Sequence, residues 1–547
     1  MTFDSINQTT FKTSTSSHPT STFYTTQTST ESSSTFDSTS VTTIVTTSRA
    51  GSSASGTSTQ GVFIPETNDS DSVSTSWSQT STGLTTSSTG STTTYSTTAS
   101  PALNPYLDNW LTYHGNYWRT GTESGGLSTF GYASRAWSSQ TLDGMIYAEP
   151  LVANHTIYAA TEGDSVYALS EQSGEVLWKV SLGQPVSVSS TGLPSSCWTI
   201  DPIGITSTPA IDPNSGTLYA VGFVSPGQFL LEAIDASNGQ QLWNRVIDPP
   251  GMNPLTQQQR AALAIANGYV YIGFGGNGGD CGRYNGYLVA APENGSGSLL
   301  SFEVPTTNGG PIWGPSGPAV DNSTGDIFIS TGNSNSTDPS NFDYGNSVIK
   351  LSPTLQVLGY FAPSDWTTLN AGDLDLGSVG PTILNQNLVF QVGKEGVGYL
   401  IQIGDMGGIS DGAYSGPICW QGSESTFTGG AYGGVAYDSP FLYVPCLTNG
   451  IIAIQLDLGS SPSFWRVWNS TGFFAGAPIV ADGAVWTVDI GGTYLGQNGT
   501  LFALNPRTGS IMYSASIGEV GHFITPSADA NMIFVGGNET IQAFTAS

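Results

Sequence analysis

The 547-residue chain has few charged residues and very few basic ones. Asp, Glu, Lys and Arg make up 10% of it, well below the proportion usual in soluble domains. Only 12 residues are Lys or Arg, against 40 Asp or Glu. The net charge of -28 opposes binding to nucleic acid or to anionic membranes at neutral pH. The scarcity of lysine also fits an acidic medium, because a lysine-poor surface avoids a large positive charge when carboxylates become neutral.

Cysteine and histidine are scarce, and their spacing excludes the common metal sites. The four cysteines, Cys197, Cys281, Cys419 and Cys446, include no C-x-x-C pair, and the four histidines have no metal-ligand spacing. A zinc site needs such spacing. Asn-x-Ser/Thr sequons are frequent, which favours an extracytoplasmic protein. There the four cysteines would form two disulfides, and the residues alone leave three pairings open.

The sequence has no apolar run long enough for a transmembrane helix. Its start, MTFDS, lacks the basic region and apolar core of a signal peptide. The true start lies upstream, export uses another route, or the protein is intracellular. Composition favours an extracellular or cell-surface location. No nucleophile elbow, P-loop, H-E-x-x-H or Rossmann fingerprint occurs in a suitable setting.

Ser and Thr dominate residues 1–102. Such a segment cannot bury enough apolar surface to offset the entropy of ordering, so we expect it to be disordered. Its composition is typical of an O-glycosylated stalk, and the alternative is an unmodified linker.

Residues 103–547 have a different pattern, in which short apolar or alternating runs stand between Gly, Asn, Asp and Pro clusters. Examples are TIYAATEG at 156–163 and DIFISTGN at 326–333. About eight such runs recur at roughly 40- to 65-residue intervals, the spacing of propeller blades. The stretch Pro254–Ala266 is the exception and reads as a helix. We therefore predict an all-β fold for 103–547, an eight-bladed β-propeller.

A second motif joins a strand, a tight turn ending in Gly and a strand carrying an aromatic ring, as in VYALSEQSGEVLW at 166–178. The turn needs Gly for positive φ, and the ring can dock between adjacent sheets. The last blade is one strand short, whereas residues 133–142, with Trp137, look like an outer strand. We expect this first strand to complete the last sheet, which removes an open edge.

This pattern resembles the PQQ-type (quinoprotein-like) propeller repeat over about residues 109–547. The opening WLTYHG at 110–115 resembles the family's W-x-x-Y-x-G. The block 312–384 is similar to quinoprotein alcohol and sugar dehydrogenases in its order of tryptophan, Asp-containing turn, T-G-N, acidic residue and W-D-x-D. The segment VGKEG at 392–396 resembles their K-x-G strand.

The resemblance implies a calcium ion, the cofactor pyrroloquinoline quinone (PQQ) and named roles. Trp313 would lie under the quinone and Lys394 would contact its oxygens. Asn333 would offer an oxygen to calcium, and Asp343 would be an acidic metal ligand or the catalytic base.

Each acidic candidate has a structural alternative. Asp373 and Asp375 would face one side of a strand and could bind a cation, or they could cap turn N–H groups. Asp343 also suits ordinary turn chemistry. Lys394 could instead form an ion pair with Asp373, Asp375 or Glu395.

Several family features are missing. The stretch 224–229 has no acid where the family supplies a calcium-binding glutamate, no Cys-Cys pair occurs, and few cations are available for the quinone carboxylates: Lys394, with Arg260 and Arg283 possible. The chain is more similar to a set of exported propellers without a settled activity, which share GITSTP at 204–209. That resemblance implies the disulfides Cys197–Cys281 and Cys419–Cys446.

Three functions follow as hypotheses. The first is an exported or cell-surface binding or scaffold module, a monomeric propeller with a degenerate quinone site. Its ligands would be extracellular proteins or glycans. The second is a calcium- and PQQ-dependent alcohol or sugar dehydrogenase. The third is a structural surface-layer or adhesion component. Fold alone does not choose between them.

Overall fold

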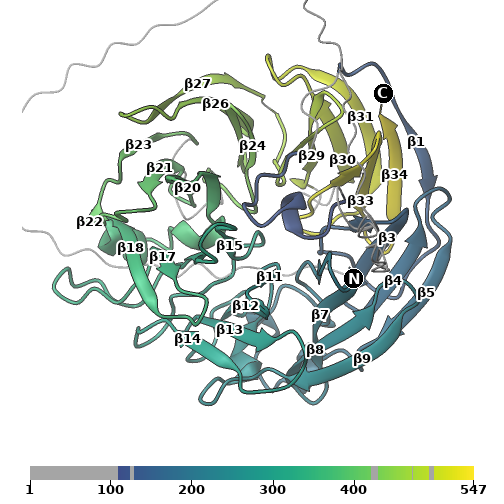
Figure 1. The fold of residues 1–547 in the computed structure, drawn as a ribbon, viewed down its shortest axis with the longest axis horizontal. Coiled ribbons are helices and arrows are strands. Elements are labelled where there is room, and N and C mark those ends of the chain that lie inside the picture. Colours follow the sequence, from purple (N-terminus) through teal and green to yellow (C-terminus); the bar gives the residue numbers. More distant parts are fainter. Residues whose placement is uncertain (1–108, 124–128, 420–428, 471, 492–497, 547) are drawn as a thin grey trace, which may run out of the picture. The chain divides into compact units, whose positions relative to one another are not determined.

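The computed structural model describes residues 109–123, 129–419, 429–470, 472–491 and 498–546. The predicted Ser/Thr-rich region 1–102 lies outside the described residues. The described residues form eight β-sheets arranged in a ring, an eight-bladed β-propeller (Figure 1). The predicted fold class is thus confirmed.

The first four blades follow one another along the chain. Blade 1 contains β2 (Leu151–Ala153), β3 (Thr156–Thr161), β4 (Ser165–Ser170) and β5 (Val176–Ser181). Blade 2 contains β6 (Ala210–Ile211), β7 (Thr217–Val224), β8 (Gln228–Asp235) and β9 (Gln240–Val246). Blade 3 contains β10 (Gln257–Gln258), β11 (Ala264–Ala266), β12 (Tyr269–Gly276), β13 (Tyr287–Pro292) and β14 (Leu300–Glu303). Blade 4 contains β15 (Ala319–Val320), β16 (Ile327–Ser330), β17 (Val348–Leu351), β18 (Val357–Pro363) and the parallel strand β22 (Gly408–Ser410).

The remaining blades complete the ring. Blade 5 contains β19 (Thr382–Asn385), β20 (Leu388–Val392), β21 (Val397–Gln402) and β23 (Tyr414–Pro417). Blade 6 contains β24 (Ala436–Asp438), β25 (Phe441–Cys446), β26 (Gly450–Asp457) and β27 (Ser463–Asn469). Blade 7 contains β28 (Ile479–Ala481), β29 (Ala484–Asp489), β30 (Gly499–Leu504) and β31 (Ile511–Gly518). Blade 8 contains β32 (Ser527–Asp529), β33 (Met532–Gly536), β34 (Ile541–Ala546) and, as its outer strand, β1 (Ala133–Ser138).

The pairing of β1 with β34 closes the ring, as the sequence predicts. The two strands are antiparallel, with Trp137 opposite Ala543. Because the first strand completes the last sheet, β34 does not present an open edge there.

Tryptophan side chains on outer strands dock on the glycine turns of the next blade. A Cβ atom at Gly174, in blade 1, would lie 2.4 Å from Trp137 of blade 8, and one at Gly239 would lie 2.8 Å from Trp178. Both glycines have positive φ, so the turn conformation and the docked ring each require glycine. The same relation links Trp243 with Gly295 and Trp468 with Gly509.

The opening segment, residues 109–123, bonds to every blade in turn. It includes the 3-10 turn η1 (Tyr113–Gly115) and lies at the centre of the ring, in dark blue (Figure 1). Its backbone or side-chain groups bond to blades 1 to 8 at Val152, Ile211, Leu263, Val320, Ile383, Tyr437, Val480 and Ala530. Arg119, which is fully buried, donates from its guanidinium to Leu263 O, Pro318 O, Thr112 Oγ1 and Tyr113 O.

The predicted helix over Pro254–Ala266 is wrong. The stretch begins with the 3-10 turn η4 (Pro254–Thr256) and then supplies β10 and β11, both of which pair with β12. Pairing with a central strand has overridden the local helix propensity.

Helices are few in the described part of the chain. Its one α-helix is α1 (Trp366–Ala371), and the other short turns are η2 (Val188–Ser190), η3 (Ser195–Cys197) and η5 (Leu376–Ser378). No helix among these residues has the length and hydropathy to span a bilayer.

Candidate functional site

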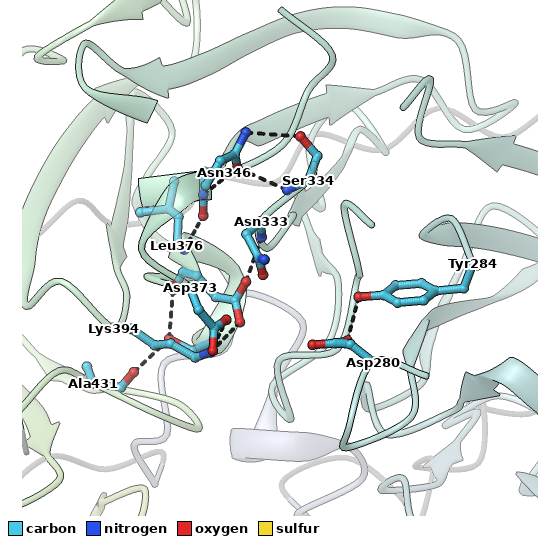
Figure 2. A network of polar contacts seen from close by, with 12 residues as sticks. Asp280, Tyr284, Asn333, Ser334, Asn346, Asp373, Leu376, Lys394 and Ala431 are labelled. Atoms are coloured by element: carbon cyan, nitrogen blue, oxygen red, sulfur yellow. Dashed lines mark hydrogen bonds and ion pairs between the residues drawn. The ribbon is translucent and has the colours of Figure 1, made fainter. Parts of the chain in front are cut away.

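Lys394 lies between two aspartates in the loops that follow β20 and α1 (Figure 2). Its Nζ is 2.9 Å from Asp373 Oδ1 and 2.6 Å from Asp375 Oδ2. The side chains differ in exposure: 16% for Lys394, 62% for Asp373 and 5% for Asp375. The two aspartates occupy the turn between α1 and η5 rather than a strand, yet both face the same ammonium.

Backbone bonds hold the buried carboxylate of Asp375 in place. Its Oδ1 accepts the N–H of Asn333 at 2.6 Å, and its carbonyl accepts the N–H of Lys394 at 3.0 Å. A Cβ atom at Gly332 would lie 2.3 Å from Asp375 Oδ1. The glycine of the T-G-N sequence therefore makes room for this carboxylate, and the chain brings Asn333, Asp375 and Lys394 together.

Aromatic rings complete this centre. Lys394 Nζ lies 5.7 Å from the ring centroid of Trp313, a cation–π distance. Trp313 is 5.9 Å from Phe523, and Phe523 stacks on Tyr432 at 6.0 Å. We call Trp313, Asn333, Asp373, Asp375 and Lys394 the Lys394 centre, because five of the six predicted site residues meet there.

Asp343, the sixth predicted residue, bonds instead to Ser334, the neighbour of Asn333 in the sequence. Its Oδ1 accepts the hydroxyl of Ser334 at 2.8 Å and the N–H of Gly345 at 3.2 Å, and the residue is buried. These bonds match the turn chemistry that was the structural alternative.

Electrostatics keep Lys394 charged. Burial would lower the pKa of the Lys394 ammonium, but Asp375 and Asp373 outweigh burial and raise that pKa above its ordinary value. Asn333, Asp343, Asp373 and Asp375 have oxygen atoms of the kind that calcium prefers. In the described ranges, however, no group of three or more His, Cys, Asp or Glu side chains could hold a metal ion.

Comparisons with known proteins find similar sequences and structures for this propeller. The family model described as outer membrane protein assembly factor BamB matches residues 117–298. Among solved structures, the quinohemoprotein alcohol dehydrogenase ADHIIG from Pseudomonas putida HK5 is similar, with a TM-score of 0.61 at 16% identity, covering 81% of each chain. The quinohemoprotein alcohol dehydrogenase from Comamonas testosteroni has a TM-score of 0.59 at 15% identity, also covering 81% of each chain. A europium-containing methanol dehydrogenase has a TM-score of 0.59 at 14% identity, covering 81% of this chain and 99% of the other. A search of curated proteins gives no match.

This chain distantly resembles PQQ-type propellers. At identities of 14–16% the similarity establishes the fold and leaves the activity undecided.

Other residues of the propeller lie near the Lys394 centre without a predicted role. Asp280 accepts the Tyr284 hydroxyl at 2.6 Å on the side facing Asp373 and Lys394 (Figure 2). Phe523 and Tyr432 come from loops of later blades. No local pattern marks these residues, because the closure of the ring alone brings their loops to the centre.

A small cavity lies next to Phe523. Its volume is about 10 Å³, room for about one water molecule. Its lining residues are Tyr113, Tyr147, Thr206, Thr208, Arg260, Pro315, His522 and Phe523. Arg260 lies 5.1 Å from the Phe523 ring, whereas Arg283 is exposed. Burial and Arg260 lower the pKa of His522 well below its usual value, so this histidine is neutral.

The two disulfides, Cys197–Cys281 and Cys419–Cys446, have the pairing that the resemblance implied. Cys281 directly follows Asp280. Cys419 packs against Gly396, where a Cβ atom would lie 2.8 Å away. Each bridge therefore anchors a loop beside the Lys394 centre.

Proposed function

We propose that this propeller, which resembles the PQQ type, is an exported or cell-surface binding or scaffold module in which the quinone site is degenerate. Its ligands would be extracellular proteins or glycans bound by the loops around the Lys394 centre. One observation carries the proposal: the ammonium of Lys394 lies between the carboxylates of Asp373 and Asp375, the groups that a cation would need.

The donor set fits calcium poorly. Calcium takes six to eight oxygen ligands, whereas one oxygen of Asp375 already accepts the N–H of Asn333 and the other contacts Lys394. Asp343 is bonded to Ser334 and Gly345. We therefore derive no chemical step through calcium at this centre.

The residues also fit a quinone tricarboxylate poorly. Phe523 lies against Trp313, the ring that would carry the cofactor. Of the cations, Lys394 is neutralised by two aspartates and Arg260 packs over Phe523. Binding three further carboxylates beside these groups would be costly.

The alternative is a calcium- and PQQ-dependent alcohol or sugar dehydrogenase. It is favoured by the proximity of Trp313, Asn333 and Lys394, since these are the residues to which the resemblance gives cofactor roles.

Loading experiments separate the two functions. Purified full-length protein is titrated with PQQ in the presence of Ca²⁺ by calorimetry, and dye reduction is then followed with alcohols and sugars. We expect no heat of PQQ binding and no turnover. Tight binding with sustained dye reduction would overturn the binding-module proposal in favour of a dehydrogenase.

Ligand capture addresses the binding role directly. A glycan array and a pull-down from cell envelopes would use the wild-type protein and Asp280→Ala, a substitution at an exposed position beside the Lys394 centre. Capture that weakens in the variant supports binding at this face. Equal, abundant recovery of both proteins as an envelope lattice component would instead support the surface-layer function.

A further inference from the structure

The turn between β3 and β4 contains two buried carboxyl groups outside the Lys394 centre. Glu162 is 2% exposed and Asp164 is 0% exposed. Glu162 Oε2 accepts the N–H of Gly204 at 2.7 Å. Glu162 Oε1 and both carboxyl oxygens of Asp164 are buried without a well-formed hydrogen bond. The polar groups that act on them are the Thr206 hydroxyl at Glu162 and the Phe223 N–H at Asp164, and burial outweighs both.

These groups lie at the contact between blades 1 and 2, whose strands β3, β4 and β7 are neighbours in the ring (Figure 1). A Cβ atom at Gly222 of β7 would lie 2.6 Å from Asp164 Oδ1, and one at Gly204 would lie 2.5 Å from the carbonyl oxygen of Glu162. Both glycines thus let the turn pack closely. We call Glu162, Asp164, Gly204 and Gly222 the acid joint.

Few charges surround the joint. Asp143, from the loop before β2, raises the negative potential at Asp164, but it is itself bonded to Lys179 of β5 at 2.7 Å. Arg260, between β10 and β11 of blade 3, favours the ionised form of Glu162 and lowers its pKa. Tyr147, in the loop before β2, is a titratable group whose pKa the charge of Glu162 raises. Gly222 of β7, the blade 2 residue that lies against Asp164, carries no charge, and neither does Leu182, which follows β5 of blade 1 and also lies beside Gly222.

An ionised carboxylate in such a place would be unstable. Burying an unpaired charge is strongly unfavourable, whereas a protonated carboxyl group is far easier to bury. We propose that Glu162 and Asp164 form a proton-loaded joint, which holds blades 1 and 2 together in acid and loosens as the pH rises.

The direction of the pH effect follows from linkage. Burial, together with the charge of Glu162, raises the pKa of Asp164 to about 8, and burial raises the pKa of Glu162 to about 7. A raised acid pKa means that the folded state holds its proton more tightly than the unfolded state. The stabilisation is complete below the ordinary carboxyl pKa of about 4 and is lost as the pH rises towards 8.

The joint also adjoins the small cavity, since Arg260 and Tyr147 act on Glu162 and line that cavity. Loosening of the joint should therefore reach the cavity before it reaches distant blades.

The test is the isosteric substitution Asp164→Asn, which mimics the protonated acid. We expect the variant to match the wild-type Tm at pH 4.5 and to exceed it by roughly 2–5 °C at pH 8.5. The matched control is Asp457→Asn, at an exposed aspartate, which should leave the pH profile unchanged. Hydrogen exchange of residues 203–209 and 220–224 should speed up between pH 5 and pH 8.5 in the wild type, and less in the variant.

Two results would overturn the proposal. One is a parallel Tm–pH profile for the wild type, Asp164→Asn and Glu162→Gln. The other is a rise in wild-type Tm with 1 mM Ca²⁺ at pH 8.5 that is absent from Asp164→Asn, because the carboxylates would then hold a cation rather than protons. Glu162→Gln is the second variant, should Asn at position 164 prevent folding.

Discussion

At the scale of single residues, burial separates two aspartates that contact the same lysine. Asp373 is mostly exposed, so its ion pair with Lys394 is screened by solvent. Asp375 is buried and receives the ammonium and a backbone N–H. Lys394 therefore stabilises the fold chiefly as the counter-charge of the buried Asp375 carboxylate, whatever the centre binds.

We predict that Lys394→Met destabilises the protein by about 3 kcal/mol, because it leaves the Asp375 carboxylate buried without its counter-charge. The control Asp373→Asn should cost less than about 1 kcal/mol, since that pair is largely exposed. Denaturant unfolding measures both. If the double variant Lys394→Met/Asp375→Asn is no more stable than Lys394→Met, the ion pair is not the cause.

At the scale of elements, the ring is joined by repeated contacts and by one segment that occurs once. Tryptophans dock on glycine turns between several neighbouring blades. The opening segment instead bonds to all eight blades. The seam between blades 8 and 1 combines strand β1 with the docked Trp137, and its indole N–H donates to Glu171 O at 2.8 Å.

We predict that Trp137→Ala weakens this seam by about 2–3 kcal/mol, because it removes the docked ring and leaves a cavity. Gly174→Ala should have a similar effect, since the new Cβ atom would meet the same ring at a positive φ. The control is Leu177→Ala at an exposed position of β5, within about 0.5 kcal/mol of wild type. Thermal unfolding and hydrogen exchange of β1 and β34 measure the stability of this seam. Unchanged hydrogen exchange in Trp137→Ala would contradict the role of the docked ring.

At the scale of the whole molecule, buried and half-buried carboxyl groups recur around the ring. Burial raises the pKa of Glu232 to about 7 and those of Asp482 and Asp529 to about 6. These groups lie in blades 2, 7 and 8. With so few basic residues in the chain, each is easier to bury with its proton than as an anion.

We predict that the propeller is more stable at about pH 4–5 than at pH 8. Each raised pKa stabilises the folded state below the ordinary carboxyl pKa, and this contribution is lost as the pH rises through 6 to 7. Calorimetry across pH 3–9 measures the profile. A stability at pH 8 that equals or exceeds the stability at pH 4–5 would contradict the prediction. A sharp loss of folding below about pH 4 would contradict the adaptation to acid that the composition suggests.

Much of the fold could be predicted because it is encoded locally. Each blade repeats an apolar strand, a glycine turn and an aromatic ring, so Trp178 and Gly174 reveal their roles within one short window. The incomplete last blade and the strand at residues 133–142 likewise predicted the closure. Trp313, Asn333 and Lys394 could be recognised because they stand in motifs of a known order. Their cofactor roles, like the stalk at residues 1–102, stay predictions.

The sequence by itself determined the number of blades and the closing strand, because each strand and turn is encoded by a pattern within a few residues. Its motifs also pointed to Trp313, Asn333 and Lys394, whose roles stay predictions. Only the tertiary structure decided that Lys394 is held by both aspartates, that Asp343 bonds to Ser334 and Gly345, and that Pro254–Ala266 pairs as strands. It also decided which loops supply Phe523 and Tyr432. The physical reason is that these contacts join residues far apart in the chain, and only the packing of the closed ring determines their positions.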